Sequence, residues 1–297
     1  MEHIVTPEED GMRLSSLLRQ VMKVSYSAMK SAKWDNRILV SGQPRTVDQP
    51  VYTGETVAFL LPDNQPLYRP AAYDLPLTVP YEDEHLLIID KPAPLPSLSS
   101  AKQSDMTLEN AVFSHLGCQD SFIYRPVNRL DKGTSGLMIV AKNAHAQQLL
   151  QRMLHTDAFA RRYLAVVEGT PAPFSGVIDA PIAKEDAASI RRVITPEGKP
   201  SVTHYEVLDA CHDRSIVRLQ LMTGRTHQIR VHMAHIGHPV CGDFLYGWEL
   251  PELTGRFALH SCEIDLVHPF TGEQLHIESP LPEALQALMY HSGGQHG

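Results

Sequence analysis

The sequence predicts an α+β fold with a mixed, largely antiparallel sheet, and three observations support this class. Short apolar or alternating runs typical of strands recur at 86–90, 137–141, 163–168, 202–208 and 215–222. These runs do not alternate regularly with helices, as they would in a doubly wound parallel sheet. The glycine-rich loops of P-loop and dinucleotide-binding proteins are missing from the sequence, and so is the H-E-x-x-H motif.

The first sixty residues are expected to form a small α/β module. Apolar residues at helical spacing predict a helix over 13–24, and Ser25 is a suitable N-cap for a second helix over 26–34. Two short strands are predicted after the helices, at 38–40 and 57–61. Two helices followed by short strands are enough for a compact unit.

A proline-rich stretch follows this module. Five prolines fall between residues 62 and 80, which excludes a helix and favours an extended linker. The predicted boundaries are therefore 1–61 for the module, 62–80 for the linker and 81–297 for the main domain.

The main domain is expected to contain most of the strands and three helices. Asn143 caps a predicted helix that runs to about His155, a second helix begins after Thr226, and a last helix covers 282–290. The strand at 163–168 is closed by Gly169. Further strands are predicted at 256–259, 264–267 and 275–278.

The net charge of −8 disfavours a protein that coats nucleic acid without discrimination. The charge is uneven, however. Residues 11–61 carry seven basic and three acidic side chains, and residues 125–165 carry seven basic and two acidic ones. Contacts to phosphate are local, so a basic surface on an acidic protein is compatible with nucleic-acid binding. The alternative is that these charges only solvate exposed faces.

The sequence shows little sign of a membrane helix, a secretory signal or a disulfide framework. No apolar run approaches the roughly 20 residues of a membrane helix, and the acidic N-terminus does not resemble a secretory signal. The four cysteines are widely spaced and form no C-x-x-C pair. This pattern disfavours a disulfide scaffold or a zinc ribbon, so we expect a cytoplasmic protein without a membrane segment.

Residues suited to chemistry concentrate in two polar segments between apolar strands, at 125–136 and 221–232. Asp131 precedes a predicted buried strand, where a carboxylate is costly unless a cation pairs with it. The second segment offers Arg225 and Arg230 as partners. The alternative for Asp131 is a turn residue that bonds to its own backbone.

The first segment resembles the signature of RluA-type pseudouridine synthases, through Asn128-Arg-Leu-Asp-x-x-Thr-Ser-Gly-Leu137 followed by Ala141-Lys142. The second segment resembles the other signature of that family, through Thr223-Gly-Arg-Thr-His-Gln-Ile-Arg-Val-His232, Gly237-His-Pro239 and Gly242-Asp-x-x-Tyr-Gly247. Shorter blocks at 90–92 and 162–169 also match, so the resemblance extends from about residue 79 to about residue 280. The module at 11–61 is similar to the RNA-binding module named after ribosomal protein S-four.

The resemblance implies a pseudouridine synthase fold, a reaction and three principal residues. Such an enzyme breaks the C1′–N1 bond of a uridine in RNA, rotates the uracil and forms a C1′–C5 bond, so no cofactor is expected. Asp131 matches the catalytic aspartate, Tyr163 the tyrosine that packs on the base, and Arg230 the cation that pairs with the aspartate. An ionised carboxylate suits a nucleophile or base, and an aromatic ring can hold a flipped base.

Further contacts are expected from the same segments and from the module. Substrate contacts are expected from Arg129, Thr134, Arg225, His227 and Gln228. RNA contacts of the module are expected from Arg13, Lys30, Lys33 and Arg37.

Two departures from the family pattern stand out. Asn128 occupies a position where the family commonly has His, and Leu-Pro-Ser-Leu-Ser-Ser at 95–100 stands where many members have Val-His-Pro. We expect both departures to change local loop contacts and neither to remove the catalytic carboxylate.

Four clustered histidines suggest a metal site as one alternative. His227, His232, His235 and His238 fall within twelve residues, but only His232 and His235 share a helix face. No cysteine or carboxylate stands beside them at ligand spacing, so we expect no metal.

Two other function classes stay open. A non-catalytic RNA-binding protein would keep the scaffold without needing Asp131, Tyr163 and Arg230 together. A hydrolase acting on a nucleoside bond would release free uracil. For the isomerase we expect large-subunit ribosomal RNA as the substrate, with transfer RNA as the alternative, and a monomeric protein.

Overall fold

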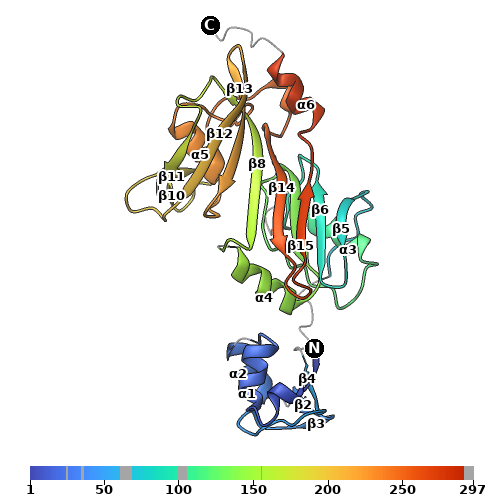
Figure 1. The fold of residues 1–297 in the computed structure, drawn as a ribbon. Helices are drawn as coiled ribbons and strands as arrows, with labels where there is room; N and C mark the ends of the chain where they lie inside the picture. The colour runs from blue at the N-terminus through green and yellow to red at the C-terminus, as the bar shows by residue number, and fades with distance from the viewer. Residues whose placement is uncertain (25, 35–36, 61–68, 100–105, 155, 291–297) are drawn as a thin grey trace. The chain divides into compact units, whose positions relative to one another are not determined.

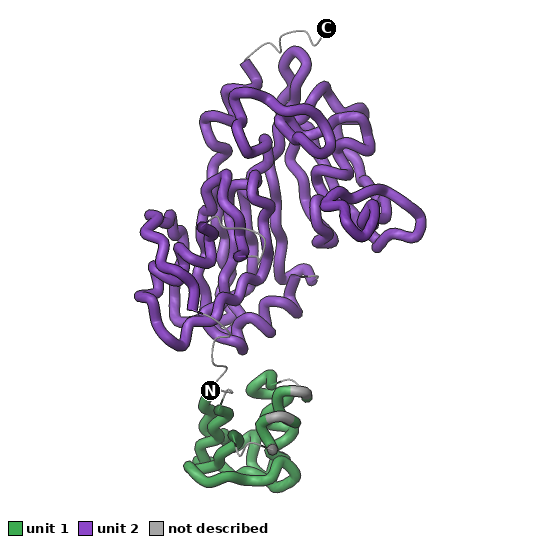
Figure 2. The backbone as a smooth tube through the Cα atoms, turned by 180° about the vertical axis from the view of Figure 1, so that it is seen from behind, with its two compact units in different colours: residues 1–67 green, residues 68–297 purple. Residues whose placement is uncertain are grey.

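The computed structural model describes residues 1–24, 26–34, 37–60, 69–99, 106–154 and 156–290 (Figure 1). It divides the chain into two units, residues 1–67 and 68–297 (Figure 2). Each unit has its own sheet and its own buried apolar cluster. The predicted α+β class with a mostly antiparallel sheet is confirmed.

The N-terminal unit packs two helical segments on a four-stranded antiparallel sheet in the order β1–β4–β2–β3. Its strands are β1 (Glu2–Ile4), β2 (Ile38–Val40), β3 (Gln43–Pro44) and β4 (Thr56–Phe59). The predicted first helix is α1 (Leu14–Ser16), which continues as a π-helical stretch over Leu17–Val21. The second is α2 (Tyr26–Trp34). The predicted cap Ser25 lies outside the described residues.

The predicted linker boundary at residue 80 is wrong. Residues 61–68 lie outside the described part of the chain, but Tyr73, Leu75, Leu77 and Val79 pack against the core of the second unit. The strand β5 (Thr78–Glu82) then joins its sheet. The physical reason is that alternate apolar side chains between the prolines give this extended segment a face that can be buried.

The second unit contains a nine-stranded sheet in the order β5–β6–β7–β14–β8–β13–β12–β9, with β15 also paired to β14. The pair β7–β14 is parallel, and the other pairs are antiparallel. Besides β5, the strands are β6 (Leu86–Lys91), β7 (Ser135–Ala141), β8 (Phe159–Glu168), β9 (Ser175–Asp179), β12 (Val202–Cys211), β13 (Arg214–Leu221), β14 (Leu259–Val267) and β15 (Gln274–Glu278). A separate hairpin pairs β10 (Ile182–Lys184) with β11 (Arg192–Ile194).

The helices of this unit are α3 (Leu108–His115), α4 (Ala144–Met153), α5 (Gln228–His235) and α6 (Glu283–Gln286). The predicted cap of α4 is present, since Asn143 Oδ1 accepts a hydrogen bond from the Ala146 backbone N at 2.8 Å. The last predicted helix is shorter than expected and ends in a 3-10 turn over Ala287–Met289. Within the described ranges, the helices lack the length and apolar character of a membrane span.

The central strands are buried on both faces, which explains their continuous apolar runs. Leu87 and Met138 belong to a large core that also includes residues of α3 and α5. Leu86 and Leu137, their neighbours, belong to a second core on the side of α4. Helix α3 and strands β9 to β11 were not predicted, because their short or polar runs carry no strong period.

A glycine fixes the start of β7 next to β14. Gly136 has a φ of +106°, and a Cβ atom placed there would lie 2.2 Å from the backbone oxygen of Ser261. Only glycine therefore allows the two strands to approach this closely. The polar loop that carries Asp131 enters the sheet directly before this point.

Candidate active site

Asp131 lies in the loop before β7, with its carboxylate directed at α5. The Asp131 backbone oxygen accepts a hydrogen bond from the Thr134 N–H at 3.1 Å, which closes a turn. The carboxylate oxygen Oδ2 accepts a hydrogen bond from Arg230 Nη1 at 2.9 Å. The turn is thus closed by backbone atoms, and the carboxylate pairs with Arg230. The Asp131 side chain keeps 29% exposure, so it is reachable from solvent.

Arg230, on the first turn of α5, is almost fully buried and is held by a second carboxylate. Its Nε donates to Asp243 Oδ2 at 2.6 Å and its Nη2 donates to Asp243 Oδ1 at 2.8 Å. The Phe257 ring covers the guanidinium, with its centroid 4.1 Å from Cζ. Burial opposes the charged form, but the bonds and charges of Asp243 and Asp131 outweigh it, so the pKa of Arg230 is raised.

A cavity of about 590 Å³ opens beside Asp131. Tyr163, near the middle of β8, lines it and is itself buried. Its other lining side chains include the predicted substrate residues Arg129, Arg225 and His227. Among the described lining residues, four carry a guanidinium or ammonium group and one carries a carboxylate, Asp131. The cavity therefore suits an anionic substrate.

The structure places two predicted substrate residues away from this cavity. Thr134 is buried behind the Asp131 turn and does not line the cavity. Gln228 is also buried and uses its amide within the protein. Its Oε1 accepts from Thr223 Oγ1 and from the Arg225 N–H, while its Nε2 donates to the Val202 backbone oxygen and Thr203 Oγ1. Gln228 therefore holds the 223–228 loop in shape.

His227 faces Asp131 from the side of α5. Its Nε2 lies 3.7 Å from Asp131 Oδ2, and its Nδ1 is 2.8 Å from the Tyr246 hydroxyl. The Tyr246 hydroxyl in turn accepts a hydrogen bond from the Arg192 backbone N–H of β11. This link ties the hairpin β10–β11, which lies beside α5 (Figure 1), to the same site.

Sequence reasoning gave no role to Asp243, Tyr246 or Phe257, although each contacts a predicted site residue. The first two fall in the block Gly242-Asp-x-x-Tyr-Gly247, which was noted only as part of a resemblance. A sharper signal was available there. A buried arginine needs a fixed carboxylate partner, and Asp243 is the nearest acidic residue downstream of Arg230.

The two departures from the family pattern have local contacts. Asn128 Oδ1 accepts from the Ile139 N–H of β7 at 2.8 Å, so the side chain ties the loop to the sheet. Ser97, from the unusual stretch at 95–100, donates its hydroxyl to the Leu130 backbone oxygen at 2.6 Å. Both contacts brace the part of the loop that directly precedes Asp131.

Three basic residues of the N-terminal unit line a groove of about 640 Å³. Lys30 and Lys33 line it together with Arg19 and Tyr26. Arg13 and Arg37, also predicted to contact RNA, are not among its lining residues. Arg37 Nη1 donates instead to the Leu60 backbone oxygen at 3.1 Å.

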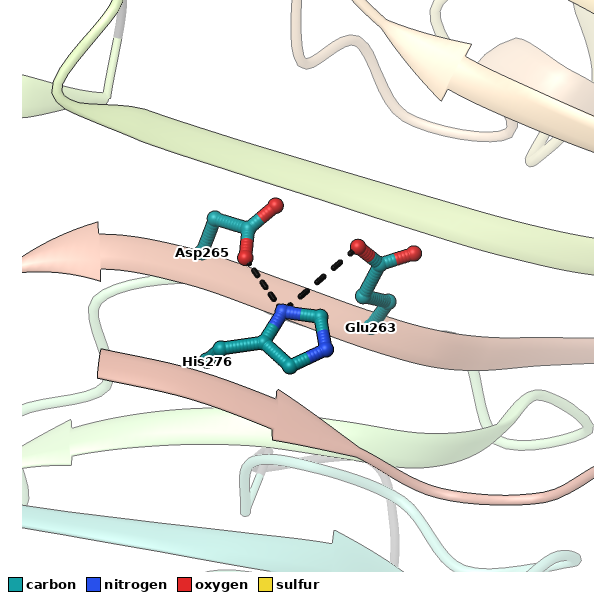
Figure 3. A group of neighbouring side chains, drawn as sticks. All are labelled: Glu263, Asp265 and His276. Atoms are coloured by element: carbon teal, nitrogen blue, oxygen red, sulfur yellow. Dashed lines mark hydrogen bonds and ion pairs between the residues drawn. The ribbon is translucent and has the colours of Figure 1, made fainter. Parts of the chain in front are cut away.

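Among the residues that the structure describes, one group of side chains of the kind that bind metals lies on β14 and β15 (Figure 3). Glu263, Asp265 and His276 approach one another there, and His276 Nδ1 lies 2.6 Å from Asp265 Oδ1. Arg162 donates to both carboxylates and supplies one positive charge against their two. The clustered histidines of the sequence do not point to one centre either. Both ring nitrogens of His232 bond to protein oxygens, on Thr203 and Ala180.

Comparisons with known proteins agree on one family. A family model described as RNA pseudouridylate synthase matches residues 85–235. The chain is 39% identical over 253 residues to the uncharacterized RNA pseudouridine synthase YjbO of Bacillus subtilis, covering 84% of this chain and 88% of the relative. It is 37% identical over 291 residues to ribosomal large subunit pseudouridine synthase D of Nitrosomonas europaea, covering 94% and 84%. A solved structure, human RNA pseudouridylate synthase domain containing 1, matches with a TM-score of 0.55 and 26% identity, covering 69% and 83%.

Proposed function

Since this chain belongs to the RluA-type family of RNA pseudouridine synthases, and is thus an isomerase, we propose that it acts on uridine in large-subunit ribosomal RNA with Asp131 as the catalytic carboxylate. The ion pair between Asp131 and Arg230 carries the proposal. A nearby guanidinium favours the ionised carboxylate, which is the form that can act as nucleophile or base.

The chemistry of the reaction fits the groups around the cavity. The C1′–N1 bond of the uridine breaks and a C1′–C5 bond forms, while C5 loses one proton and N1 gains one. The net change is zero, so the reaction needs only groups that position the base and move protons. Asp131 is partly open to the cavity, and the buried Tyr163 ring offers an apolar surface for the uracil.

The cavity also suits the backbone of an RNA. Arg129, Lys132, Arg161 and Arg225 line it, and phosphate contacts by such side chains position a nucleic acid without reading its sequence. A uridine inside folded RNA must leave its stack to reach Asp131, and an aromatic ring can hold the flipped base. We assign that role to Tyr163.

The choice of ribosomal RNA rests on relatives. The relative of Nitrosomonas europaea is named for the large ribosomal subunit and matches 94% of this chain. Transfer RNA is the alternative substrate. We further propose that the groove of the N-terminal unit binds RNA through Lys30 and Lys33. The monomeric state and the cytoplasmic location stay predictions.

The test is to map pseudouridine in RNA from cells that lack the protein, and from the same cells supplied with wild type, Asp131→Asn or Asp120→Asn. Asp131→Asn keeps the size of the side chain and removes its charge. We expect wild type and the exposed control Asp120→Asn to restore a modification in large-subunit ribosomal RNA, and Asp131→Asn to restore none. If the cells that lack the protein instead lose a pseudouridine in transfer RNA, transfer RNA is the substrate. Full restoration by a folded Asp131→Asn protein would refute the catalytic assignment.

A further inference from the structure

His227 occupies a shared wall between two cavities. The cavity of about 590 Å³ beside Tyr163 and a second one of about 450 Å³ are both lined by Asp131, Lys132, Thr226 and His227. His227 immediately precedes α5 and has a left-handed backbone, with φ of +60° and ψ of +17°. Outside glycine this conformation is uncommon, although Asn, Asp and His adopt it more often than other residues. This backbone directs the ring between Asp131 and Tyr246.

The groups on either side of His227, Tyr246 and Asp131, favour one of its two neutral tautomers. The Tyr246 oxygen accepts from the Arg192 backbone N–H at 2.8 Å. The hydroxyl still has its own proton to donate, and we assign it to His227 Nδ1, also at 2.8 Å, because the Asp131 carboxylate that faces Nε2 can only accept. In a neutral ring, an Nδ1 that accepts a hydrogen bond leaves Nε2 as the nitrogen that carries the proton. That N–H faces Asp131 Oδ2 at 3.7 Å.

The same carboxylate oxygen receives Arg230. In the described part of the chain, the contacts of the Asp131 carboxylate with Arg230 and His227 both involve Oδ2. Arg230 donates a hydrogen bond to Oδ2 and His227 Nε2 faces the same atom, so Oδ1 is the oxygen left for the substrate. A separation of 3.7 Å is longer than a hydrogen bond, but contacts of this kind often tighten when the substrate binds.

We propose that His227 is a positioning residue: its Nε2–H, fixed by Tyr246, acts with Arg230 to hold Asp131 Oδ2, so that Oδ1 is the oxygen presented to the uridine. This inference rests on the proposed role of Asp131. A neutral ring suits the role, because burial lowers the pKa of His227 even though Asp131 acts against this. The proposal changes the role first expected of His227, from substrate contact to support of the carboxylate.

The experiment compares His227→Gln with His227→Asn in the full-length protein on its RNA substrate. A Gln side chain can place an N–H close to the position of Nε2, whereas the shorter Asn reaches only the position of Nδ1. We expect single-turnover rates of His227→Asn to fall by about 10- to 100-fold with little change in KM, since a hydrogen bond to a charged group is lost. His227→Gln should keep most of the rate. Tyr246→Phe removes the hydroxyl that bonds to Nδ1, so either ring nitrogen of His227 can carry the proton. Its single-turnover rate should lie between those of the two His227 variants.

A purely structural role makes the opposite prediction. Asn tolerates the left-handed conformation at position 227 better than Gln does, so thermal stability should favour His227→Asn. The proposal therefore requires the less stable variant to be the more active one. Equal rates for the two variants, or a faster His227→Asn, would overturn it. The exposed His204 on β12 is the matched control, and His204→Asn and His204→Gln should both behave as wild type.

Failure of this inference can be told apart from failure of the proposed function. An inactive Asp131→Asn together with a fully active His227→Asn would overturn only the role of His227. An active Asp131→Asn would remove the catalytic assignment on which that role depends, and would overturn both.

Discussion

Arg230 and Asp243 form a two-bond ion pair inside the second unit, with side-chain exposures of 3% and 0%. The pair uses Nε and Nη2 of the guanidinium, which leaves Nη1 for Asp131. Because Asp243 fixes the plane of the guanidinium, the direction of Nη1 is set before any substrate binds. Asp243 therefore orients the Arg230 guanidinium so that Nη1 points at the Asp131 carboxylate.

Arg230→Lys should test this geometry. A lysine keeps the positive charge but cannot make the two parallel bonds to Asp243 and a third to Asp131. We expect the free energy of unfolding to fall by about 1–3 kcal/mol, the cost of leaving buried polar groups without partners. Pseudouridine formation should fall as well. Urea unfolding and a product assay provide the measurements.

The matched control is Arg218→Lys. Arg218 is exposed, and its Nη1 lies 3.5 Å from Glu206 Oε2. An exposed pair contributes about 1 kcal/mol or less, so this variant should keep its stability and activity. Similar losses in both variants would mean that the fork geometry of Arg230 is unimportant.

Tyr163→Phe should separate stacking from proton transfer. The phenyl ring keeps the surface on which the uracil stacks, so RNA affinity should stay within about twofold of wild type. If the hydroxyl takes part in moving a proton, kcat should fall at least about tenfold. Tyr205→Phe on β12 is the control, because its hydroxyl bonds to the Pro173 backbone oxygen outside the cavity. An unchanged kcat for Tyr163→Phe would limit Tyr163 to packing on the base.

The double substitution Lys30→Gln and Lys33→Gln should weaken RNA binding through the groove of the N-terminal unit. Each phosphate contact contributes about 0.7–0.9 to the slope of log affinity against log salt concentration. Loss of two contacts should therefore make that slope shallower by about 1.4–1.8, measured by titration at several salt concentrations. Lys23→Gln, an exposed change outside the groove, should leave the slope close to that of wild type. Equal slopes for all three proteins would give the groove another role.

The buried Lys91 side chain should make the free energy of unfolding depend on pH. Burial lowers the pKa of Lys91 to about 7 from an ordinary value of 10.5, although the charge of Asp131 acts against this. Between these two values the unfolded chain binds one proton more than the folded chain, so the free energy of unfolding rises with pH across this window. Below about pH 7 both states are protonated and the contribution is constant.

The measurement compares wild type with Lys91→Met by urea unfolding at pH 7 and pH 9. Raising the pH should stabilise wild type by about 2 kcal/mol more than Lys91→Met, because the variant has no amine to protonate. Other titrating groups are common to both proteins and cancel in the comparison. The same pH response in both proteins would contradict a coupling between Lys91 and folding.

Sequence patterns were sufficient wherever a local signal decides the structure. The apolar runs at 86–90 and 137–141 predicted strands β6 and β7, because strands buried on both faces need continuous apolar residues. Asn143 predicted the start of α4, because capping involves only the neighbouring backbone. The short strands β10 and β11 were not predicted, because three-residue segments carry no measurable period.

For the site, the sequence determined which side chains are available, and the tertiary structure decided what each of them contacts. The sequence singled out Asp131, Tyr163 and Arg230 through their resemblance to family signatures, and a carboxylate near an arginine is a chemical pairing that residue types alone suggest. It did not distinguish His227, which faces Asp131, from Gln228, whose amide is used up inside the protein. Neighbouring residues before and at the start of a helix point in different directions, and their partners come from distant segments. Asp131 and Arg230 are separated by 99 positions, and only the folded sheet brings them to 2.9 Å.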